Sequence, residues 1–226
     1  MKNSWFQPIN RHTFAVKFGF HTLTNAQAES PLRQFSRGEM NTKNRNRCFW
    51  VNMKNPLYID YHDKEWGVPE HSDKKLFEML ILESFQAGLT WECILNKREN
   101  FRKAFDNFDI EKISHYNTEK CAQLLTDTGI IRNKLKINGA VTNSLIFKQI
   151  QKEYGSFDKY IWGFTDGKVI FEPCDIRTTS PLSDAISKDL KKRGMKFVGS
   201  TIIYSYLQAI GIINGHLKNC YLYKQE

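Results

Sequence analysis

The spacing of apolar and polar positions from Cys48 onward is that of α-helices for most of the chain. Apolar side chains recur three and four residues apart, Ser, Asp or Asn precedes several of these runs, and Gly follows some of them. The pattern predicts helices over Lys74–Ala87, Asn100–Phe105, Ile110–Tyr116, Thr118–Asp127, Asn133–Tyr154, Ser183–Arg193 and Ser200–Ile213. It predicts a strand only over Lys168–Cys174. We therefore expect one compact, mainly α domain of roughly 180 residues.

The predicted helix Lys74–Ala87 is apolar on almost every side, which is typical of a helix buried in the core. Glu83 lies on the same stripe as Leu76 and Leu80, so its carboxylate is expected in the interior. An unpaired carboxylate is costly there. Two explanations stay open: Glu83 pairs with an arginine or caps an amide, or it lines a pocket and accepts hydrogen bonds from a ligand.

The segment after this helix predicts a tight turn, because Gly88 permits a sharp exit and leaves Leu89 exposed. Trp91 is then expected to turn back toward the core. An apolar residue at the tip of a turn beside a polar pocket is suited to wedge between stacked bases. The simpler alternative is that Leu89 packs against a neighbouring helix.

A second turn joins the predicted helices on either side of Gly129. The turn contains Ile130 and Ile131, and the basic residues Arg132, Lys134 and Lys136 follow. Backbone amides at such a turn, near the positive end of the next helix dipole, can bind a phosphate without reading sequence. An ordinary helical hairpin with a solvated basic face is the alternative, and the second glycine usual in such hairpins is Ile131 here.

Two cysteines and two histidines bracket the folded region. Cys48 and His62 lie at its start, and His216 and Cys220, four residues apart as on one helical turn, lie at its end. Two thiolates and two neutral imidazoles suit a closed tetrahedral zinc site that would join the two ends. Because no CxxC occurs, buried cysteines with capping histidines are the alternative.

Aromatic residues gather around the first of these pairs, at Trp50, Tyr58, Tyr61 and Trp66, and Trp91 follows further on. Such density usually reflects a packed core. Tyr58, Tyr61 and Trp66, however, lie in a segment with Pro, Gly and Asp, which favours a slot built from loops for a planar ligand.

Composition and charge restrict the function only weakly. Lys and Arg exceed Asp and Glu by nine over 226 residues, but residues 1–47 carry eight basic and two acidic side chains and hold most of this excess. We expect residues 1–46 to be a flexible basic extension, with Met40 as an alternative start, and residues 47–226 to be the functional domain. No apolar run is long enough to span a bilayer, and an odd number of cysteines without a secretory signal favours the cytoplasm.

Taken together, these motifs resemble the Tag-type branch of the 3-methyladenine DNA glycosylases, in the helix-hairpin-helix superfamily. The resemblance covers about residues 47–223. The segments that carry it are Arg47–Val51, Pro56–Pro69, Glu83–Trp91, Gly129–Asn133, Ser183–Gly199 and Asn214–His216.

The resemblance implies a role for each candidate residue. Glu83 matches the glutamate that contacts the flipped base, and Leu89 matches the residue that plugs the duplex. The other implied sets are the aromatic pocket of Trp50, Tyr58, Tyr61, Trp66 and Trp91, in which Tyr61 is assigned with Glu83 to catalysis, the DNA-binding hairpin of Gly129, Ile130, Ile131 and Arg132, and the structural zinc ligands Cys48, His62, His216 and Cys220. The implied fold is the helix-hairpin-helix glycosylase fold with one Zn²⁺ per chain that joins its N- and C-terminal segments.

The implied activity is monofunctional hydrolysis of the N-glycosidic bond of 3-methyladenine in alkylated double-stranded DNA by a cytoplasmic monomer. No lysine is an obvious amine nucleophile, and we assign Glu153 and Asp158 to surface solvation. A non-catalytic helix-hairpin-helix DNA-binding module is the alternative. A second alternative keeps the enzyme class and releases 3-methylguanine or 7-methylguanine.

Overall fold

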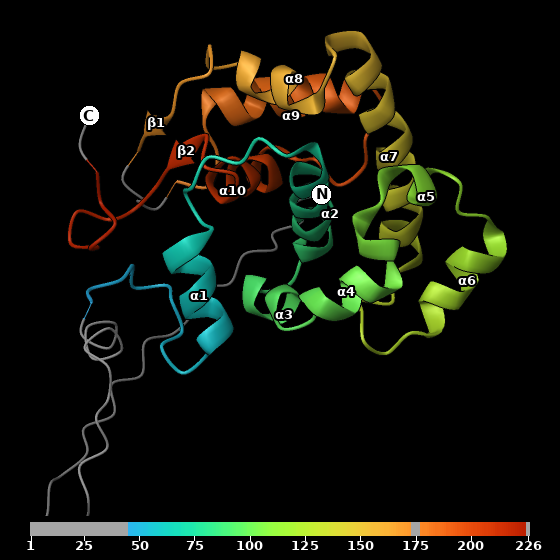
Figure 1. Ribbon diagram of the computed structural model, residues 1–226, viewed down its shortest axis with the longest axis horizontal. Coiled ribbons are helices and arrows are strands. Elements are labelled where there is room, and N and C mark those ends of the chain that lie inside the picture. The colour runs from blue at the N-terminus through green and yellow to red at the C-terminus, as the bar shows by residue number, and fades with distance from the viewer. Residues whose placement is uncertain (1–44, 173–176, 225–226) are drawn as a thin grey trace, which may run out of the picture. The chain divides into compact units, whose positions relative to one another are not determined.

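Helices make up most of the part of the chain that the computed structural model describes, residues 45–172 and 177–224 (Figure 1). The helices are α1 (Pro56–Lys64), α2 (Asp73–Gln86), α3 (Trp91–Leu95), α4 (Arg98–Ala104), the 3₁₀ helix η1 (Asp106–Phe108), α5 (Ile110–Ser114), α6 (Thr118–Thr126), α7 (Lys134–Tyr154), α8 (Phe157–Gly163), α9 (Pro181–Lys192) and α10 (Ser200–Ala209). Two short strands, β1 (Ile170–Phe171) and β2 (Ile213–Asn214), pair in parallel. The mainly α fold expected from the sequence is confirmed. Nearly all of the expected extension, residues 1–44, lies outside the described residues.

Helix α2 forms the centre of the core. Every residue from Leu76 to Phe85 is buried, and the helix packs against α10 on one side and α7 on another (Figure 1). This follows from its sequence, because a helix that is apolar on every side is stable only when other helices surround it. Glu83 is carried into the interior by the same packing.

Asn and Asp side chains begin the helices that build the right-hand part of Figure 1. Asp109 accepts a hydrogen bond from Lys112 N at the start of α5, and Asn117 accepts one from Lys120 N at the start of α6. These caps agree with the sequence prediction. Ser72 at the start of α2 forms no such bond.

Three short helices, α1, α3 and α8, are absent from the sequence prediction. The prediction of a loop that carries Tyr58 and Tyr61 is therefore wrong, and both residues lie on α1. The predicted strand Lys168–Cys174 is confirmed only at Ile170–Phe171, and Cys174 lies outside the described residues.

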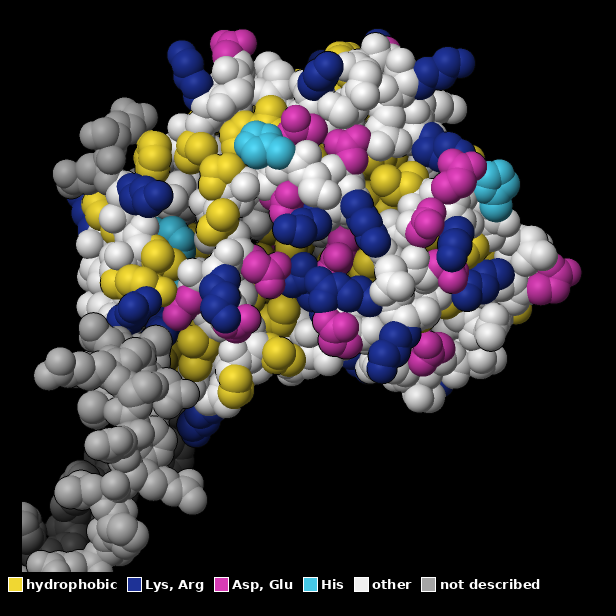
Figure 2. Space-filling model, viewed as in Figure 1, with side chains coloured by type: hydrophobic (Ala, Val, Ile, Leu, Met, Phe, Trp, Pro, Cys, Tyr) yellow, Lys and Arg dark blue, Asp and Glu magenta, His cyan; other side chains and the backbone are white. Residues whose placement is uncertain are grey.

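Charged side chains of both signs are mixed on the surface. Figure 2 shows Lys and Arg interspersed with Asp and Glu over one face, so this face has no large region of a single charge. Within the described ranges, no helix combines the length and the apolar character that a membrane span requires.

Gly211 determines where α10 ends, four residues before the end of the predicted helix. Its φ is +74°, and a Cβ at this position would lie 2.3 Å from the carbonyl carbon of Val68. The main chain comes this close because Gly67 N–H donates to Gln208 O at 2.9 Å. Glycine is thus required both for the left-handed backbone and for the close approach.

We expect Gly211→Ala to lower the free energy of unfolding by about 3 kcal/mol, because a methyl group strains φ and also clashes with main-chain atoms. Urea unfolding followed by circular dichroism measures the change. Gly163→Ala at the end of α8 is the matched control, since open space surrounds its missing Cβ, and a change below about 1 kcal/mol is expected. Equal losses in the two variants would contradict this account.

Candidate active site and metal centre

An aromatic cavity of about 200 Å³ lies beside α2, and we call it the base pocket. It is lined by Trp50, Tyr58, Tyr61, Trp66, Glu83, Gln86, Trp91, Ser205 and Gln208. All six residues that the sequence predicted for base recognition line this cavity. They come from the segment before α1, from α1 and the turn after it, from α2 and from α3, and α10 closes the remaining side.

The aromatic walls of the base pocket are held by ring contacts. The Trp50 ring centroid lies 5.6 Å from that of Tyr58 and 4.8 Å from that of Trp66. The Tyr61 and Trp91 centroids are 5.1 Å apart. Tyr61 is fully buried, and this burial raises the pKa of its phenol well above the usual value, so the phenol keeps its proton at neutral pH.

Glu83 is the acid of the base pocket. Its exposed fraction is 3%, and its Oε2 has no hydrogen-bond partner among the described residues. Burial raises the pKa of its carboxyl from 4.5 to about 8. The open alternative of a pairing with arginine is therefore not realised at Glu83. It applies to Glu78 on the same helix, whose Oε1 accepts from Arg98 Nε at 2.7 Å and from Arg102 at 2.7 Å.

Unpaired polar atoms are concentrated in the base pocket. Among the described residues, the buried side-chain atoms without a partner are Glu83 Oε2, Trp91 Nε1 and Gln208 Nε2, and all three residues line this cavity. They provide one acceptor and two donors. Since buried polar groups are normally hydrogen-bonded, their coincidence in one cavity indicates a site for a polar, planar ligand.

The polar side of the base pocket on α10 was missed by the sequence analysis. Ser205 and Gln208 lie three residues apart on this helix and both face the cavity. The available signal was a glutamine within the otherwise apolar run that ends α10, where a buried amide needs an explanation. Gln86 lies at the other edge of the cavity, at the last residue of α2.

Leu89 lies on an exposed turn next to the base pocket. We call residues 87–89 the plug turn. Gly88 has φ +78°, Leu89 N–H donates to Gln86 O at 2.7 Å, and 39% of Leu89 is exposed. Because Gln86 itself lines the cavity, this turn places an exposed apolar side chain at the cavity's edge.

Residues 127–133 connect α6 to α7 and contain the predicted DNA-binding hairpin. Gly129 N–H donates to Asp127 Oδ1 at 2.7 Å, and the side chain of Ile130 is buried in the core. In the described part of the chain, the amides of Ile131 and Arg132 have no partner, and Arg132 is exposed. The available donors of this turn are thus fewer than the sequence suggested.

Lys136 departs from the predicted basic face. The sequence analysis grouped it with Arg132 and Lys134, both of which are exposed, but only 8% of Lys136 is exposed. Its ammonium group donates to main-chain carbonyls at the end of α2. The interpretation of Lys136 as part of a solvated phosphate-binding face is therefore wrong, because the side chain points into the protein.

The four predicted metal ligands meet in one buried cluster. The ligand atoms of Cys48, His62, His216 and Cys220 all lie within 4.8 Å of one another. Cys220 Sγ is 3.5 Å from His62 Nε2 and 3.6 Å from His216 Nδ1, and Cys48 Sγ is 3.7 Å from His216 Nδ1. Ligands at Zn–N and Zn–S bond lengths in a tetrahedron would be about 3.3–3.8 Å apart, so the donors fit such an ion.

The surroundings of this cluster also suit a metal. His62 Nδ1 contacts Asp63 Oδ1 at 2.8 Å, and the carboxylate of Asp63 accepts from Arg47 Nε at 2.8 Å. Such a carboxylate on the second ring nitrogen orients a histidine ligand. The cluster joins α1 to the segment after β2, where His216 and Cys220 lie on a turn and not on the helical turn that their spacing suggested.

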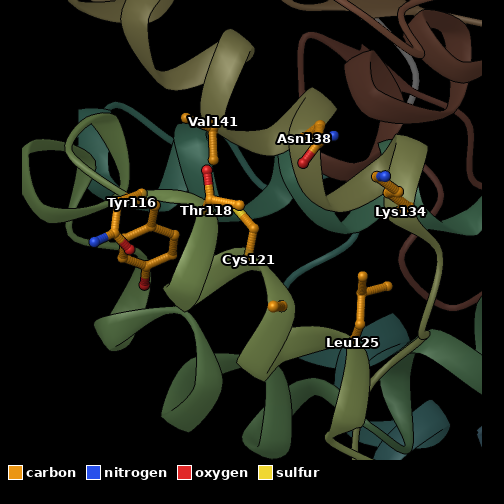
Figure 3. A pocket seen from close by; sticks show the side chains of 9 residues that line it. Tyr116, Thr118, Cys121, Leu125, Lys134, Asn138 and Val141 are labelled. Atoms are coloured by element: carbon orange, nitrogen blue, oxygen red, sulfur yellow. The ribbon is translucent and has the colours of Figure 1, made fainter.

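A second cavity of about 400 Å³ lies between α6 and α7 (Figure 3). Its lining includes Tyr116, Cys121, Leu125, Lys134 and Val141. It contains no acidic residue, and none of the unpaired buried polar atoms lies in it. The base pocket is therefore the better candidate for chemistry, although it is the smaller of the two.

The comparisons with known proteins agree with this geometry. The sequence model of the methyladenine glycosylase family matches residues 50–223. The chain is 45% identical over 181 residues to DNA-3-methyladenine glycosylase 1 of Escherichia coli, across 78% of this chain and 96% of that one.

Solved structures give the same result. A crystal structure of a 3-methyladenine DNA glycosylase I has a TM-score of 0.76 and 45% identity, and the match covers 79% of this chain and 100% of that one. The Staphylococcus aureus enzyme studied for 3-methyladenine recognition has a TM-score of 0.73 and 34% identity, with 76% and 94% covered. With the aromatic cavity and its unpaired glutamate in place, these similarities show that the chain belongs to the methyladenine glycosylase family.

Proposed function

We propose that this chain is a DNA-3-methyladenine glycosylase that binds alkylated double-stranded DNA, takes the damaged nucleotide out of the stack and hydrolyses its N-glycosidic bond. The observation that carries the proposal is the unpaired carboxyl of Glu83 inside an aromatic cavity. A purely DNA-binding module has no use for such a cavity. The E. coli relative is named for the same activity, and its whole length is matched almost completely.

The chemistry of the lesion determines what the base pocket must supply. N3-methylated adenine is positively charged while attached to deoxyribose, so it is already a good leaving group. Water attacks C1′, the C1′–N9 bond breaks with its electron pair going to the base, neutral 3-methyladenine leaves, and the water proton passes to solvent. Rings that stack on the cation, and a carboxylate near it, stabilise the charge better than bulk water does.

Glu83 is the proposed acceptor for the amino hydrogens of the flipped base. Burial raises the pKa of its carboxyl to about 8, and the positive charge of an entering base would lower this pKa again and so favour the ionised form that attracts the base. Tyr61 remains a neutral phenol that can donate a hydrogen bond to the base. The remaining aromatic residues, Trp50, Tyr58, Trp66 and Trp91, are proposed to stack on and enclose the purine.

A monofunctional reaction is consistent with the lining of the base pocket. No lysine is among the residues that line it, so the cavity offers no amine for a covalent intermediate. Two acids outside the cavity have other partners: Glu153 Oε1 accepts from Arg193 Nη2 at 3.2 Å, and Asp158 contacts His71 at 2.7 Å. Among the acids, Glu83 is therefore the one assigned to recognition and electrostatic support, together with Tyr61 and the tryptophans.

The turn between α6 and α7 is proposed to act as the helix-hairpin-helix phosphate clamp. The free amides of Ile131 and Arg132 and the exposed Arg132 side chain supply the donors, while Gly129 and Ile130 shape the turn. Leu89 is proposed to fill the gap that the extruded nucleotide leaves. The small excess of basic over acidic residues after residue 47 agrees with a small phosphate footprint.

The Cys/His cluster is proposed to hold one structural Zn²⁺, which would cross-link the segment before α1 to the segment after β2. Cys48, His62, His216 and Cys220 supply the four ligands, as the distances between their donor atoms allow. The cluster leaves no open position for substrate, so its proposed contribution is to folding and to the placement of Trp50 and Trp66, whose rings contact His62.

Glu83→Gln is expected to reduce the release of 3-methyladenine from alkylated DNA by about 100- to 1000-fold, because the amide keeps the shape and loses the charge. Chromatography of the released base measures the effect. Glu99→Gln, at an exposed position on α4, is the control that should leave the rate unchanged. Full activity of the Glu83 variant would refute the proposed role.

The raised pKa of Glu83 also predicts how stability depends on pH. Because the folded state binds this proton more tightly than the unfolded chain, with a pKa of about 8 against 4.5, its contribution to stability is complete below about pH 4.5 and is lost as the pH rises through 8. The loss is on the order of 5 kcal/mol. Glu83→Gln removes this pH-dependent loss. Thermal melts from pH 5 to pH 8 should therefore show the stability of the variant increasing relative to that of the wild type. If the melting temperatures of variant and wild type changed in parallel with pH, the account of Glu83 as a buried, unpaired carboxyl would be contradicted.

Elemental analysis is expected to find one zinc ion per chain. Cys220→Ser should lose the metal and lower the melting temperature by about 5–10 °C, which corresponds to a loss of about 2–3 kcal/mol for a domain of this size. Cys121→Ser, a half-buried cysteine outside the cluster, is the control and should retain both. Metal-free protein with an unchanged melting temperature would remove the zinc proposal.

A further inference from the structure

Two lysines connect the plug turn to the turn between α6 and α7. We call residues 128–133 the hairpin turn. Lys136, three residues after the hairpin turn, donates to Phe85 O and to Ala87 O, the second of which begins the plug turn, and Lys97, in the segment that follows the plug turn, donates to carbonyls of the hairpin turn. Each turn is thus tied to a segment that adjoins the other.

Lys136 reaches from the first turn of α7 to the end of α2. Its Nζ lies 2.7 Å from Phe85 O and 2.6 Å from Ala87 O. These carbonyls belong to the last turn of α2 and to its C-cap, where carbonyls lack intrahelical donors and the helix dipole is negative. The buried ammonium group therefore fixes the residue that begins the plug turn, two positions before Leu89.

Lys97 provides the reciprocal link, from the position just before α4. Its Nζ lies 3.1 Å from Thr128 O and 3.3 Å from Gly129 O. Asn100 Nδ2 adds a third donor, at 3.4 Å from Gly129 O. The hairpin turn is therefore held by side chains that follow the plug turn in sequence, and α3 is the short connection between them.

These contacts give both lysines a role other than phosphate binding. Lys136 is buried, and both of its short contacts are to main-chain oxygens inside the protein. Lys97 is half-buried and likewise donates to main-chain oxygens. This burial lowers the pKa of the Lys136 ammonium group. Each lysine thus fixes the distance between two segments of the chain.

We propose that Lys97 and Lys136 are positioning residues that hold Leu89 at a fixed distance from the phosphate clamp, so that gripping the DNA backbone and filling the vacated stack occur as one step. The inference rests on the proposed function, in which the hairpin turn binds the DNA backbone and Leu89 fills the base stack. Such positioning matters for catalysis because a displacement of about 1 Å can cost about 100-fold in rate. The positioning of Leu89 matters only in duplex DNA, where the extruded nucleotide leaves a gap in the base stack, and not in single strands.

The test compares two lysines two residues apart. Lys136→Met keeps the length of the side chain and removes its donors, while Lys134→Met removes the same charge from an exposed position of the same helical turn. Each full-length variant is assayed for single-turnover release of 3-methyladenine from alkylated duplex and from alkylated single-stranded DNA. Binding of free 3-methyladenine, followed by tryptophan fluorescence, and the salt dependence of duplex binding complete the set.

For Lys136→Met we expect the duplex rate at saturating enzyme to fall about 10- to 100-fold. The single-strand rate and the affinity for the free base should stay within about twofold of wild type, because the base pocket is intact, and the salt slope should not change. For Lys134→Met we expect the opposite: an unchanged rate at saturation, and a slope of log affinity against log salt that is at most about one unit smaller.

Three results would overturn the proposal. One is a duplex rate of Lys136→Met within twofold of wild type. Another is an equal loss on single strands and on the free base, which would mean that the lysine only supports the base pocket. The third is a reduced salt slope, which would mean that Lys136 binds phosphate. None of these results is confused with failure of the proposed function, because that failure would appear as wild-type protein that releases no 3-methyladenine.

Lys97→Met provides the second variant, and it keeps the proposal testable if Lys136→Met does not fold. It should show the same selective loss on duplex DNA. A 2-aminopurine base beside the lesion reports whether Leu89 enters the stack, and its fluorescence change on binding should be reduced in this variant. An unchanged fluorescence response together with an unchanged duplex rate would overturn the role of Lys97.

Discussion

The structure depends on one costly arrangement, a carboxyl group buried without a partner on the central helix of an apolar core. Glu83 is carried inside because α2 is surrounded by α10, α7 and α8, and among the described residues no arginine pairs with it as Arg98 pairs with Glu78. A protein made only for stability would pair such a group or replace it. An unpaired carboxyl is useful only if a ligand pairs with it. The cationic lesion proposed for this chain has the charge opposite to that of the carboxylate.

The wall opposite α2 depends on a long-range connection between the two ends of the described chain. Trp50, Tyr58, Tyr61 and Trp66 come from a segment of 17 residues that contains one short helix. The Cys/His cluster fastens this segment to the residues after β2, and the hydrogen bond from Gly67 to Gln208 fastens it to α10. The aromatic wall is therefore placed by contacts between residues about 150 positions apart, and not by local structure.

The plug turn and the hairpin turn are held in place in a similar way. They are separated by about forty residues, yet a lysine-to-carbonyl bond ties each of them to a segment that adjoins the other. Charged side chains on main-chain acceptors give a connection that is stiffer than apolar packing, because their geometry is directional. Helix ends offer such acceptors, so a buried ammonium group can fix a turn without an acidic partner.

The sequence alone determined α2, α6, α7 and α9, whose apolar spacing and flanking residues predict helices, and it also brought forward Glu83, the aromatic residues and the four metal-ligand candidates. It did not determine α1, because the Pro, Gly and Asp of that segment favour a loop, nor the burial of Lys136, because a charged side chain is expected in solvent. Gln208 and Ser205 were not predicted either: a glutamine in an apolar run indicates a buried amide, but nothing local to α10 indicates which cavity it faces. Only the tertiary structure decided these points, because the partner of a buried polar group is chosen by packing between segments that are distant in sequence.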